Sequence, residues 1–292
     1  MIFSIINKLF RKNKKHLISL PAKPAPIEIL ESDPYDRAYY WAWQQEGMKT
    51  LVRLCYKTPD FAENARRFSE SEEFAQTVDL LRSHMSFSSY KPKVLDFGCG
   101  NGIASYALSK KGFDVIGLDS SNGLLAGLGA ARKLNGLDGV QVLFQHHDGE
   151  RVSLPEQSLD VIYLREVLHH IKDLGGFLRN LHNLLRPGGL VICLRDVVVW
   201  NESQRQDFFA KHPLYPITQD EGCYHLNEYI EAFENSGYEL LRVLAPTESV
   251  INAYPTAFTE PYPFDYERAK KRQEGYDLFT FLAQKKHEIK FI

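Results

Sequence analysis

The stretch Val94-Leu95-Asp96-Phe97-Gly98-Cys99-Gly100-Asn101-Gly102 joins a short apolar run to three alternating glycines, and a segment with helical character follows it. Glycine has no Cβ atom, so alternating glycines let the backbone turn sharply and approach a ligand closely. The dinucleotide-binding pattern G-x-G-x-x-G would place its third glycine at position 103, where this chain has Ile103. The stretch therefore predicts a ligand-binding turn whose glycine spacing differs from the dinucleotide pattern.

Short apolar runs alternate with helical segments after this turn. The expected strands are Lys93–Phe97, Asp114–Asp119, Val140–His146, Leu159–Leu164 and Leu190–Arg195, and the expected helices are Ile103–Lys111, Gly123–Asn135 and Leu174–Leu185. Strands separated by helices of about 10–15 residues are typical of right-handed crossovers in a parallel sheet. Two further strands, Tyr238–Leu244 and Leu278–Gln284, fit a closing antiparallel hairpin. The pattern predicts an α/β fold with a doubly wound, mostly parallel seven-stranded sheet.

Aspartates follow three successive strands of the predicted sheet. They are Asp96 before the glycines, Asp119 after the second strand and Asp148 after the third. Ligands of doubly wound sheets bind outside the carboxyl ends of the strands, although single aspartates are also common in turns and at helix N-termini. No lysine or P-loop serine accompanies the glycines, which argues against a triphosphate. We expect a ligand with ribose hydroxyl groups or a positive charge.

Together these residues resemble the Rossmann-like class I S-adenosylmethionine-dependent methyltransferases over residues 93–196. Asp96 to Gly102 is similar to the D-x-G-x-G-x-G loop of that family, around the methionine part of the cofactor. Asp119 stands where the family's acidic residue binds the ribose, and Asp148-Gly149 where a residue pair meets the adenine. The resemblance implies S-adenosyl-L-methionine as cofactor. The implied cofactor-binding residues are Asp96, Gly98, Cys99, Gly100, Asn101, Gly102, Asp119, Ser120, Asp148, Gly149 and Arg165.

The activity implied by the resemblance is methyl transfer to a small-molecule acceptor. A sulfonium is already an activated methyl donor, so the protein's main tasks are alignment and exclusion of water. An acceptor that is protonated at neutral pH, such as a phenol, also needs a base. The candidate catalytic residues are His169, His170 and Glu166, with Asp196 as a further acid. The two histidines can equally serve packing or cofactor contact.

The chain divides into a terminal segment and one methyltransferase-like domain. Residues 1–33 combine a basic amphipathic stretch with a proline-rich linker, and residues 34–292 form the domain. Within it we expect a helical cap (34–90), a cofactor-binding core (91–200) and substrate-side elements with the closing hairpin (201–292), including an insertion at about 246–277. The amphipathic stretch 1–15 fits peripheral contact with an anionic membrane surface, and a frayed or disordered terminus is the alternative.

Aromatic residues are concentrated in two segments outside the core pattern. Residues 34–56 and 254–276 hold 12 of the 36 aromatic residues. We expect the two segments to meet over the cofactor and to line an apolar or aromatic acceptor pocket; packing against each other as a buried cap is the alternative. An irregular polar and aromatic loop at 212–225 lies where the resembling family shapes its acceptor pocket.

The overall charge and the cysteine spacing argue against some classes of partner and site. The net charge of −2 and pI near 6.6 give no overall basic footprint, so no nucleic-acid partner is expected. Four cysteines without C-x-x-C spacing argue against a metal site and favour reduced thiols in the cytoplasm. Two alternatives stay open. One is methylation of nucleic acid or protein, weakened by Tyr163-Leu164-Arg165-Glu166 in place of an Asn/Asp-Pro-Pro-Tyr-like sequence; the other is a non-catalytic S-adenosylmethionine-binding protein.

Overall fold

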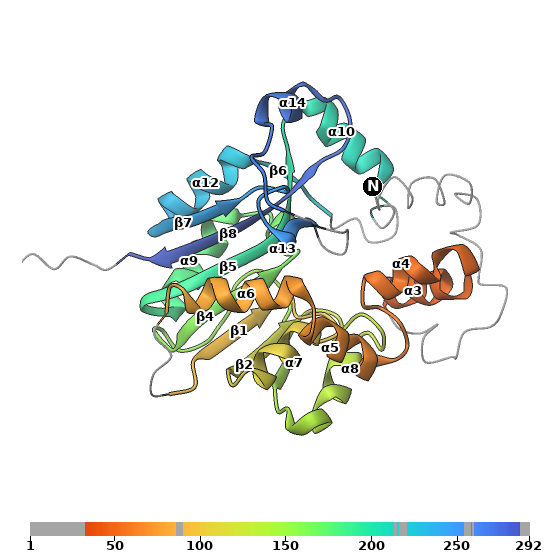
Figure 1. Ribbon diagram of the computed structural model, residues 1–292. Helices are drawn as coiled ribbons and strands as arrows, with labels where there is room; N and C mark the ends of the chain where they lie inside the picture. Colours follow the sequence, from red (N-terminus) through yellow and green to blue (C-terminus); the bar gives the residue numbers. More distant parts are fainter. Residues whose placement is uncertain are drawn as a thin grey trace, which may run out of the picture.

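The computed structural model describes residues 33–85, 90–212, 215, 221–253, 258 and 260–286 of the chain. Within them the strands form one sheet of order β3-β2-β1-β4-β5-β8-β7, and the short strand β6 pairs with β5 (Figure 1). The strands are β1 Lys93–Phe97, β2 Asp114–Asp119, β3 Leu143–His146, β4 Leu159–Arg165, β5 Leu185–Val199, β6 Tyr224–His225, β7 Tyr238–Leu244 and β8 Asp277–Lys285. Strands β1 to β5 are parallel to one another, whereas β8 is antiparallel to both β5 and β7. The predicted doubly wound sheet with a closing hairpin is confirmed, and β6 is an additional strand.

Helices cover both faces of this sheet. On one face the core includes residues of α5 (Phe61–Ser69), α6 (Glu72–Arg82) and α7 (Ile103–Lys110). On the other it includes residues of α9 (Leu174–Leu184) and α12 (Leu226–Asn235). A parallel sheet covered on both faces has strands that read as continuous apolar runs. This is the reason that the central strands could be predicted from apolar runs alone.

Neighbouring residues of strand β1 belong to different cores. Val94 belongs to the core with α5 to α7 and Leu95 to the core with α9 and α12. Both side chains are fully buried, as the two-residue period of a strand requires. Strand β1 is thereby fixed on both sides, and the glycine turn that follows it starts from a rigid position.

The amino-terminal helices divide into two groups. Helices α5 and α6 pack on the sheet, but α3 (Pro34–Gln44), the 3₁₀ helix η1 (Glu46–Met48) and α4 (Lys49–Leu54) share a small core of their own. Figure 1 shows α3 and α4 together at one end of the α/β body. Of the helical cap expected over residues 34–90, only this second group lies apart from the sheet.

The segment after β2 differs from the expected helix Gly123–Asn135. It contains only a one-turn helix, α8 (Leu128–Ala131), and a 3₁₀ turn, η2 (Arg132–Leu134). The backbone N–H groups of residues 124–126 donate to the carboxylate of Asp36 in α3. Because a side chain far away in the sequence satisfies these amides, the segment does not need helical hydrogen bonds.

Strand β3 is shorter than the expected strand Val140–His146. The side chain of Asn135 accepts a hydrogen bond from the backbone N–H of Val142 at 2.9 Å and donates to its carbonyl at 3.0 Å. A 3₁₀ turn, η3 (Leu137–Gly139), precedes this point. The backbone of Val142 is therefore occupied, and pairing with β2 begins at Leu143.

The carboxy-terminal part adds α10 (Glu202–Lys211), α13 (Val250–Ala253) and α14 (Tyr266–Lys271). Helices α10 and α14 lie side by side in Figure 1, and Gln204 of α10 donates to the carbonyl of Ala269 in α14 at 2.9 Å. In its described residues, the insertion expected at about 246–277 contains the short helices α13 and α14, and α14 packs against α10.

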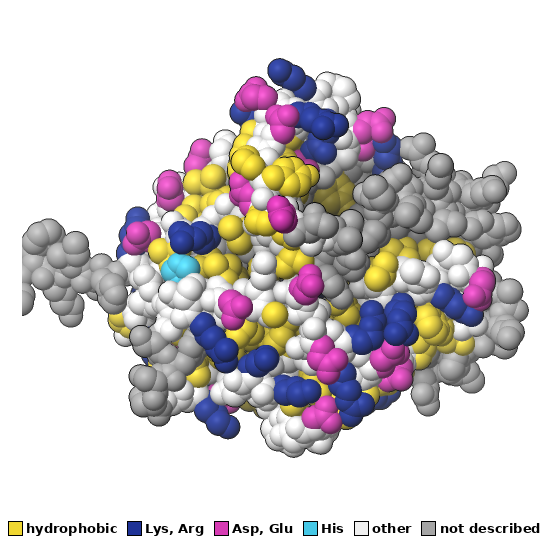
Figure 2. All heavy atoms as spheres, viewed as in Figure 1, with side chains coloured by type: hydrophobic (Ala, Val, Ile, Leu, Met, Phe, Trp, Pro, Cys, Tyr) yellow, Lys and Arg dark blue, Asp and Glu magenta, His cyan; other side chains and the backbone are white. Residues whose placement is uncertain are grey.

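The surface in Figure 2 carries interspersed basic and acidic side chains, without a contiguous basic patch on the face shown. None of the helices in the described part of the chain is both long and apolar enough to cross a membrane. The amphipathic stretch 1–15 lies outside the described residues.

Candidate active site

The glycine turn connects the carboxyl end of β1 to α7. Gly98, Gly100 and Gly102 have φ angles of +71°, +53° and +77°. A Cβ atom on Gly98 would lie 2.6 Å from a methyl carbon of Val167, and one on Gly102 would lie 2.8 Å from the Cβ of Ala131. Both the backbone conformation and the available space therefore require glycine in this turn.

Asp119 at the end of β2 holds the turn in place. Its Oδ2 accepts a hydrogen bond from the N–H of Gly100 at 2.7 Å, and its Oδ1 accepts one from the N–H of Ser121 at 2.8 Å. Burial raises the pKa of Asp119, and the two amide donors partly offset this. Each carboxylate oxygen has a second lone pair that can accept a hydrogen bond from a hydroxyl group.

Asp96 lies beneath the turn and is almost completely buried. The hydroxyl of Ser105 donates to its Oδ2 at 2.5 Å. Burial raises the pKa of Asp96 to about 7, although the hydrogen bond from Ser105 lowers it. Asp96 is therefore a carboxyl group with an affinity for protons far above that of a surface aspartate.

Asn101 and Cys99 contribute mainly to the conformation of the turn. The side-chain amide of Asn101 donates to the carbonyl of Tyr56 at 2.7 Å, which ties the turn to the segment after α4. Cys99 is buried, and its N–H donates to the carbonyl of Leu118 at 3.0 Å. Burial raises the pKa of the Cys99 thiol, so the thiol stays protonated at neutral pH.

Arg165 at the end of β4 forms a partly buried ion pair with Glu73 of α6. Its Nε lies 2.6 Å from Oε1 and its Nη2 lies 3.3 Å from Oε2 of the glutamate, whose side chain is 1% exposed. Such two-point contacts fix the orientation of the guanidinium group. Arg165 borders the cavity described below, but its guanidinium is held by α6.

Glu166 and Arg195 face each other across the ends of β4 and β5. Both are non-glycine residues with positive φ angles, of 59° and 62°, and their side chains form an ion pair of 2.8 Å. Burial alone would raise the pKa of Glu166, but the guanidinium groups of Arg165 and Arg195 outweigh it and lower the pKa to about 2. Glu166 therefore stays ionised at neutral pH.

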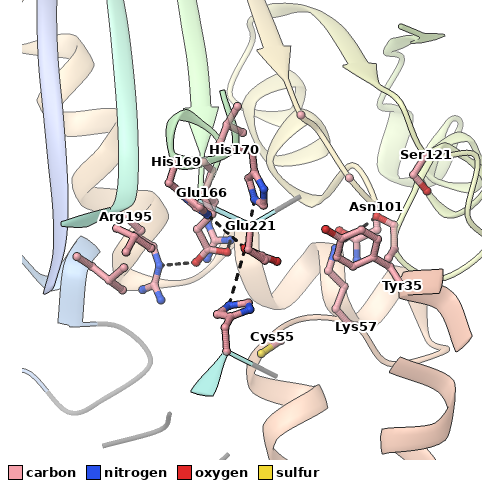
Figure 3. A pocket seen from close by; sticks show the side chains of 18 of the residues that line it. Tyr35, Cys55, Lys57, Asn101, Ser121, Glu166, His169, His170, Arg195 and Glu221 are labelled. Carbon is pink, nitrogen blue, oxygen red and sulfur yellow. Dashed lines mark hydrogen bonds and ion pairs between the residues drawn. The ribbon is translucent and has the colours of Figure 1, made fainter. Parts of the chain in front are cut away.

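His169 lies in the 3₁₀ turn η4 (Leu168–His170) that follows β4. Its Nδ1 is 3.0 Å from Oδ1 of Asp196 in β5, and its backbone N–H donates to the same oxygen at 3.2 Å. Burial raises the pKa of Asp196 to about 8. The His170 ring lies against the His169 ring, with centroids 4.2 Å apart. Figure 3 shows both rings beside the side chain of Glu221.

Helix α3 closes over the loop that follows β2. The buried carboxylate of Asp36 accepts hydrogen bonds from the N–H groups of Leu125 at 3.0 Å and Ala126 at 2.9 Å. Asp33, the N-cap of α3, contacts the hydroxyl of Ser121 in the same loop. These contacts hold the amino-terminal helices against the edge of the sheet that carries the glycine turn.

Lys57 brings a positive charge to the same region. Its Nζ donates to the carbonyl of Ala126 at 3.5 Å and lies 5.9 Å from the centroid of the Tyr39 ring. Burial lowers the pKa of Lys57, and the charge of Asp119 opposes this. Lys57 lines the same cavity as Asn101 and Tyr35, and Figure 3 labels all three.

One cavity of about 1290 Å³ connects these groups. The predicted site residues that line it are Asp96, Gly98, Cys99, Gly100, Asn101, Asp119, Ser120, Asp148, Gly149, Arg165, Glu166, His169 and His170. Gly102 is absent from the lining because it packs against Ala131 beneath the turn. Nearly all the site residues implied by the family resemblance therefore line this one cavity.

The walls of the cavity come only partly from the predicted aromatic segments. Tyr35 and Tyr39 of α3 line it, and so does Tyr276. By contrast, Phe264 stacks on Trp200, with ring centroids 6.2 Å apart, and lies outside the lining. Tyr254 lies outside the described residues. Of the segment 254–276, the described aromatic residue at the cavity is Tyr276.

Four residues of the site were not predicted from the sequence: Asp36, Lys57, Arg195 and Glu221. Each reaches the site through a contact with a residue distant in the chain, for which a single sequence gives no spacing. The one available signal was the irregular loop 212–225, which contains Glu221 and was expected near the acceptor.

A Rossmann-like sheet with this glycine turn, Asp119 and a closing helical cap defines a class I S-adenosylmethionine-dependent methyltransferase. The family model described as methyltransferase domain matches residues 40–243, and the chain belongs to this family. S-adenosyl-L-methionine is accordingly its cofactor.

Several curated relatives share part of the chain. The ubiquinone biosynthesis O-methyltransferase of Ruegeria pomeroyi is 35% identical over 35% of this chain and 40% of its own length. The enzyme of the same name from Sinorhizobium medicae is 31% identical, over 48% and 50%. Phosphoethanolamine N-methyltransferase 3 of Arabidopsis thaliana is 28% identical, over 52% and 32%. The chain thus spans half or less of the length of these relatives.

Solved structures share the fold. An S-adenosylmethionine-dependent methyltransferase from Mesorhizobium loti superimposes with a TM-score of 0.53 at 19% identity, covering 74% of this chain and 99% of that one. A Haloferax volcanii methyltransferase, solved with the Trm112 methyltransferase activator, gives a TM-score of 0.52 at 19% identity, covering 85% and 96%. At such identities the similarity concerns the fold alone.

Proposed function

We propose that the protein transfers a methyl group from S-adenosyl-L-methionine to a hydroxyl group of a small acceptor with an apolar or aromatic body. The cavity carries this proposal, because its volume of about 1290 Å³ exceeds the roughly 300–1000 Å³ of common ligand pockets. It extends from the glycine turn to apolar side chains such as Tyr39, Leu51 and Val52. There is room for a cofactor and a second molecule.

The residues at the turn fit this cofactor. Gly98 and Gly100 line the cavity, where they present backbone without a side chain to the ligand. Asp119 would accept hydrogen bonds from the ribose hydroxyl groups, and Asp148 would accept one from the adenine amine. Lys57, the half-buried cation beside the turn, would bind the carboxylate of the methionine part.

When bound, the cofactor supplies a methyl group that is already activated by the positively charged sulfur. The remaining tasks belong to the chain: α3 and α4 exclude water, and the apolar wall orients the acceptor. Glu166 is a poor base, since its pKa of about 2 makes it a weak proton acceptor. His169 and His170 are the better candidates for receiving the acceptor's proton, because the free ring nitrogen of a neutral imidazole can accept one.

The names of the relatives support an oxygen acceptor on an apolar molecule. Two of those described are named ubiquinone biosynthesis O-methyltransferase. In a hydroxylated aromatic ring with a short apolar tail, the hydroxyl group would face the polar residues Glu166, His169 and His170. The apolar part would contact the wall formed by Tyr39, Leu51 and Val52.

The test is incubation of the full chain with methyl-labelled S-adenosylmethionine and four acceptor classes: tailed phenols, water-soluble catechols, RNA and protein. We expect label in the tailed phenols. Tyr39→Ala should raise KM for the phenol without changing cofactor affinity, whereas Tyr262→Ala, at a position 62% exposed and outside the cavity, should change neither. Label confined to RNA or protein would refute the proposed acceptor class.

We also propose a cytoplasmic protein that contacts membranes peripherally through residues 1–15, where basic and apolar residues alternate with helical spacing. Flotation with anionic vesicles compares the full chain with a chain that starts at Asp33. Flotation of the full chain alone is the expected result. If neither form floats, or both do, residues 1–15 are not the membrane contact.

A further inference from the structure

Three imidazole rings surround one carboxylate in the cavity. The Nε2 atoms of His169, His170 and His212 lie 3.9, 3.8 and 3.8 Å from Oε2 of Glu221. For His169, His170 and Glu221, the atoms able to bind a metal all lie within 4.8 Å of one another. Figure 3 shows the Glu221 side chain beside the labelled rings of His169 and His170.

The backbone around Glu221 is built for this close approach. A Cβ atom on the next residue, Gly222, would lie 2.0 Å from the carbonyl oxygen of His169, so only glycine lets the two segments come so close. Strand β6 then pairs with the end of β5, and the hydroxyl of Tyr224 donates to the carbonyl of Ile171. The close approach of Gly222 to His169 and the anchoring of β6 to β5 and Ile171 therefore both bring Glu221 to the histidines.

The carboxyl group of Asp196 orients one of the rings. With its proton on Nδ1, His169 donates to Asp196, and its Nε2 then carries a lone pair on the side of Glu221. Metal-bound histidines nearly always donate their other ring N–H in this way. His169 and Glu221 are buried, whereas the His170 side chain is 30% exposed, which leaves one side of the cluster open to the cavity.

We infer that His169, His170 and Glu221 bind a divalent first-row transition-metal ion, with His212 as an additional ligand. Two or three imidazole nitrogens and one carboxylate suit Zn²⁺, Co²⁺, Fe²⁺ or Mn²⁺ better than Ca²⁺ or Mg²⁺, which prefer oxygen. Ligand atoms bound at about 2.1 Å lie roughly 3–4 Å apart. The distances here are close to that range, so small side-chain rotations complete the site.

This inference departs from the expectation of no metal, which rested on the spacing of the cysteines. The ligands come from η4, from the end of α10 and from the segment before β6, so they form no sequence motif. The consequence for catalysis rests on the proposed function: a cation at this wall would lower the pKa of an acceptor hydroxyl and reduce the need for a protein base. Binding of the ion itself does not depend on that function.

The test uses the full chain, freed of metal with a chelator, without cofactor or acceptor. Zn²⁺ is titrated by calorimetry, and Co²⁺ binding is followed by its visible absorption. We expect one tightly bound ion per chain. His170→Ala and Glu221→Gln should each weaken binding by about 100-fold or more, because loss of even a supporting group costs about 10–100-fold. His84→Ala, at a histidine outside the cavity, should bind as the natural chain does.

Circular dichroism shows which variants are folded, and one folded variant of the two suffices for the comparison. The inference is overturned if the natural chain shows no saturable binding, or if a folded His170→Ala or Glu221→Gln variant binds both ions with unchanged affinity. Calorimetry with S-adenosylmethionine on the same preparations tests the proposed function separately. A chain that binds the cofactor but no metal contradicts the metal site alone.

Discussion

Asp96 links the glycine turn to the pH dependence of stability. Its pKa is about 7 in the folded chain, because of burial, and about 3.9 in an unfolded chain. Between these pH values the folded state keeps a proton that the unfolded state has released. The free energy of unfolding therefore falls as the pH rises through this range, and it levels off above about pH 7.

Replacing Asp96 by asparagine removes this titration but keeps an acceptor for Ser105. We predict that Asp96→Asn gains stability relative to the natural chain by on the order of 2 kcal/mol between about pH 5 and about pH 7.5, since one pKa unit corresponds to about 1.4 kcal/mol. Urea unfolding at the two pH values, without cofactor, measures the difference. A stability difference independent of pH would contradict a raised pKa for Asp96.

Gly98 tests the packing of the turn. Gly98→Ala must place a Cβ atom 2.6 Å from Val167 at a φ angle of +71°, so we predict a loss of about 2–3 kcal/mol in unfolding free energy and weaker cofactor binding. Gly112→Ala is the matched control, because its φ angle is also positive but no atom lies within 4 Å of the new Cβ. It should lose only about 1 kcal/mol. Equal losses in the two variants would show that packing at Gly98 is unimportant.

At the scale of elements, helix α3 depends on one buried carboxylate. Asp36→Ala would leave the N–H groups of residues 124–126 without their acceptor, and each unsatisfied buried donor costs about 1–3 kcal/mol. We predict faster hydrogen exchange in residues 121–127 and weaker cofactor binding. Asp60→Ala, which removes an exposed N-cap of α5, should leave both unchanged. Unchanged exchange in Asp36→Ala would contradict the docking role of α3.

Elements whose residues form a clear local pattern could be predicted from the sequence. The strands β1, β2, β4 and β7 follow from apolar runs and turn residues next to them. The segment Gly123–Asn135 could not, because its amides bind Asp36, almost ninety positions earlier in the chain. A residue pattern that favours a helix is not decisive where a distant side chain satisfies the backbone.

For the whole molecule, the strand-end residues that line the cavity were predictable, whereas the residues contributed by distant segments were predictable only in part. Asp96, Asp119 and Asp148 stand directly at strand ends, and a parallel sheet brings such ends to one edge. Glu221 lies 51 positions after His170, and only the fold brings the two within 3.8 Å. The sequence marked the loop that contains Glu221, but not the residue.

The proposed function depends on binding of S-adenosyl-L-methionine in this cavity, through the glycine turn and Asp119. Calorimetric titration of the full chain with the cofactor tests it most directly. We expect saturable binding of one molecule per chain, weakened about 10–100-fold in Asp119→Asn, since hydrogen bonds to charged groups contribute about 1.5–3 kcal/mol. Asp114→Asn, at the exposed start of the same strand, should bind normally. Absence of binding, or equal affinity in Asp119→Asn and the natural chain, would contradict the claim.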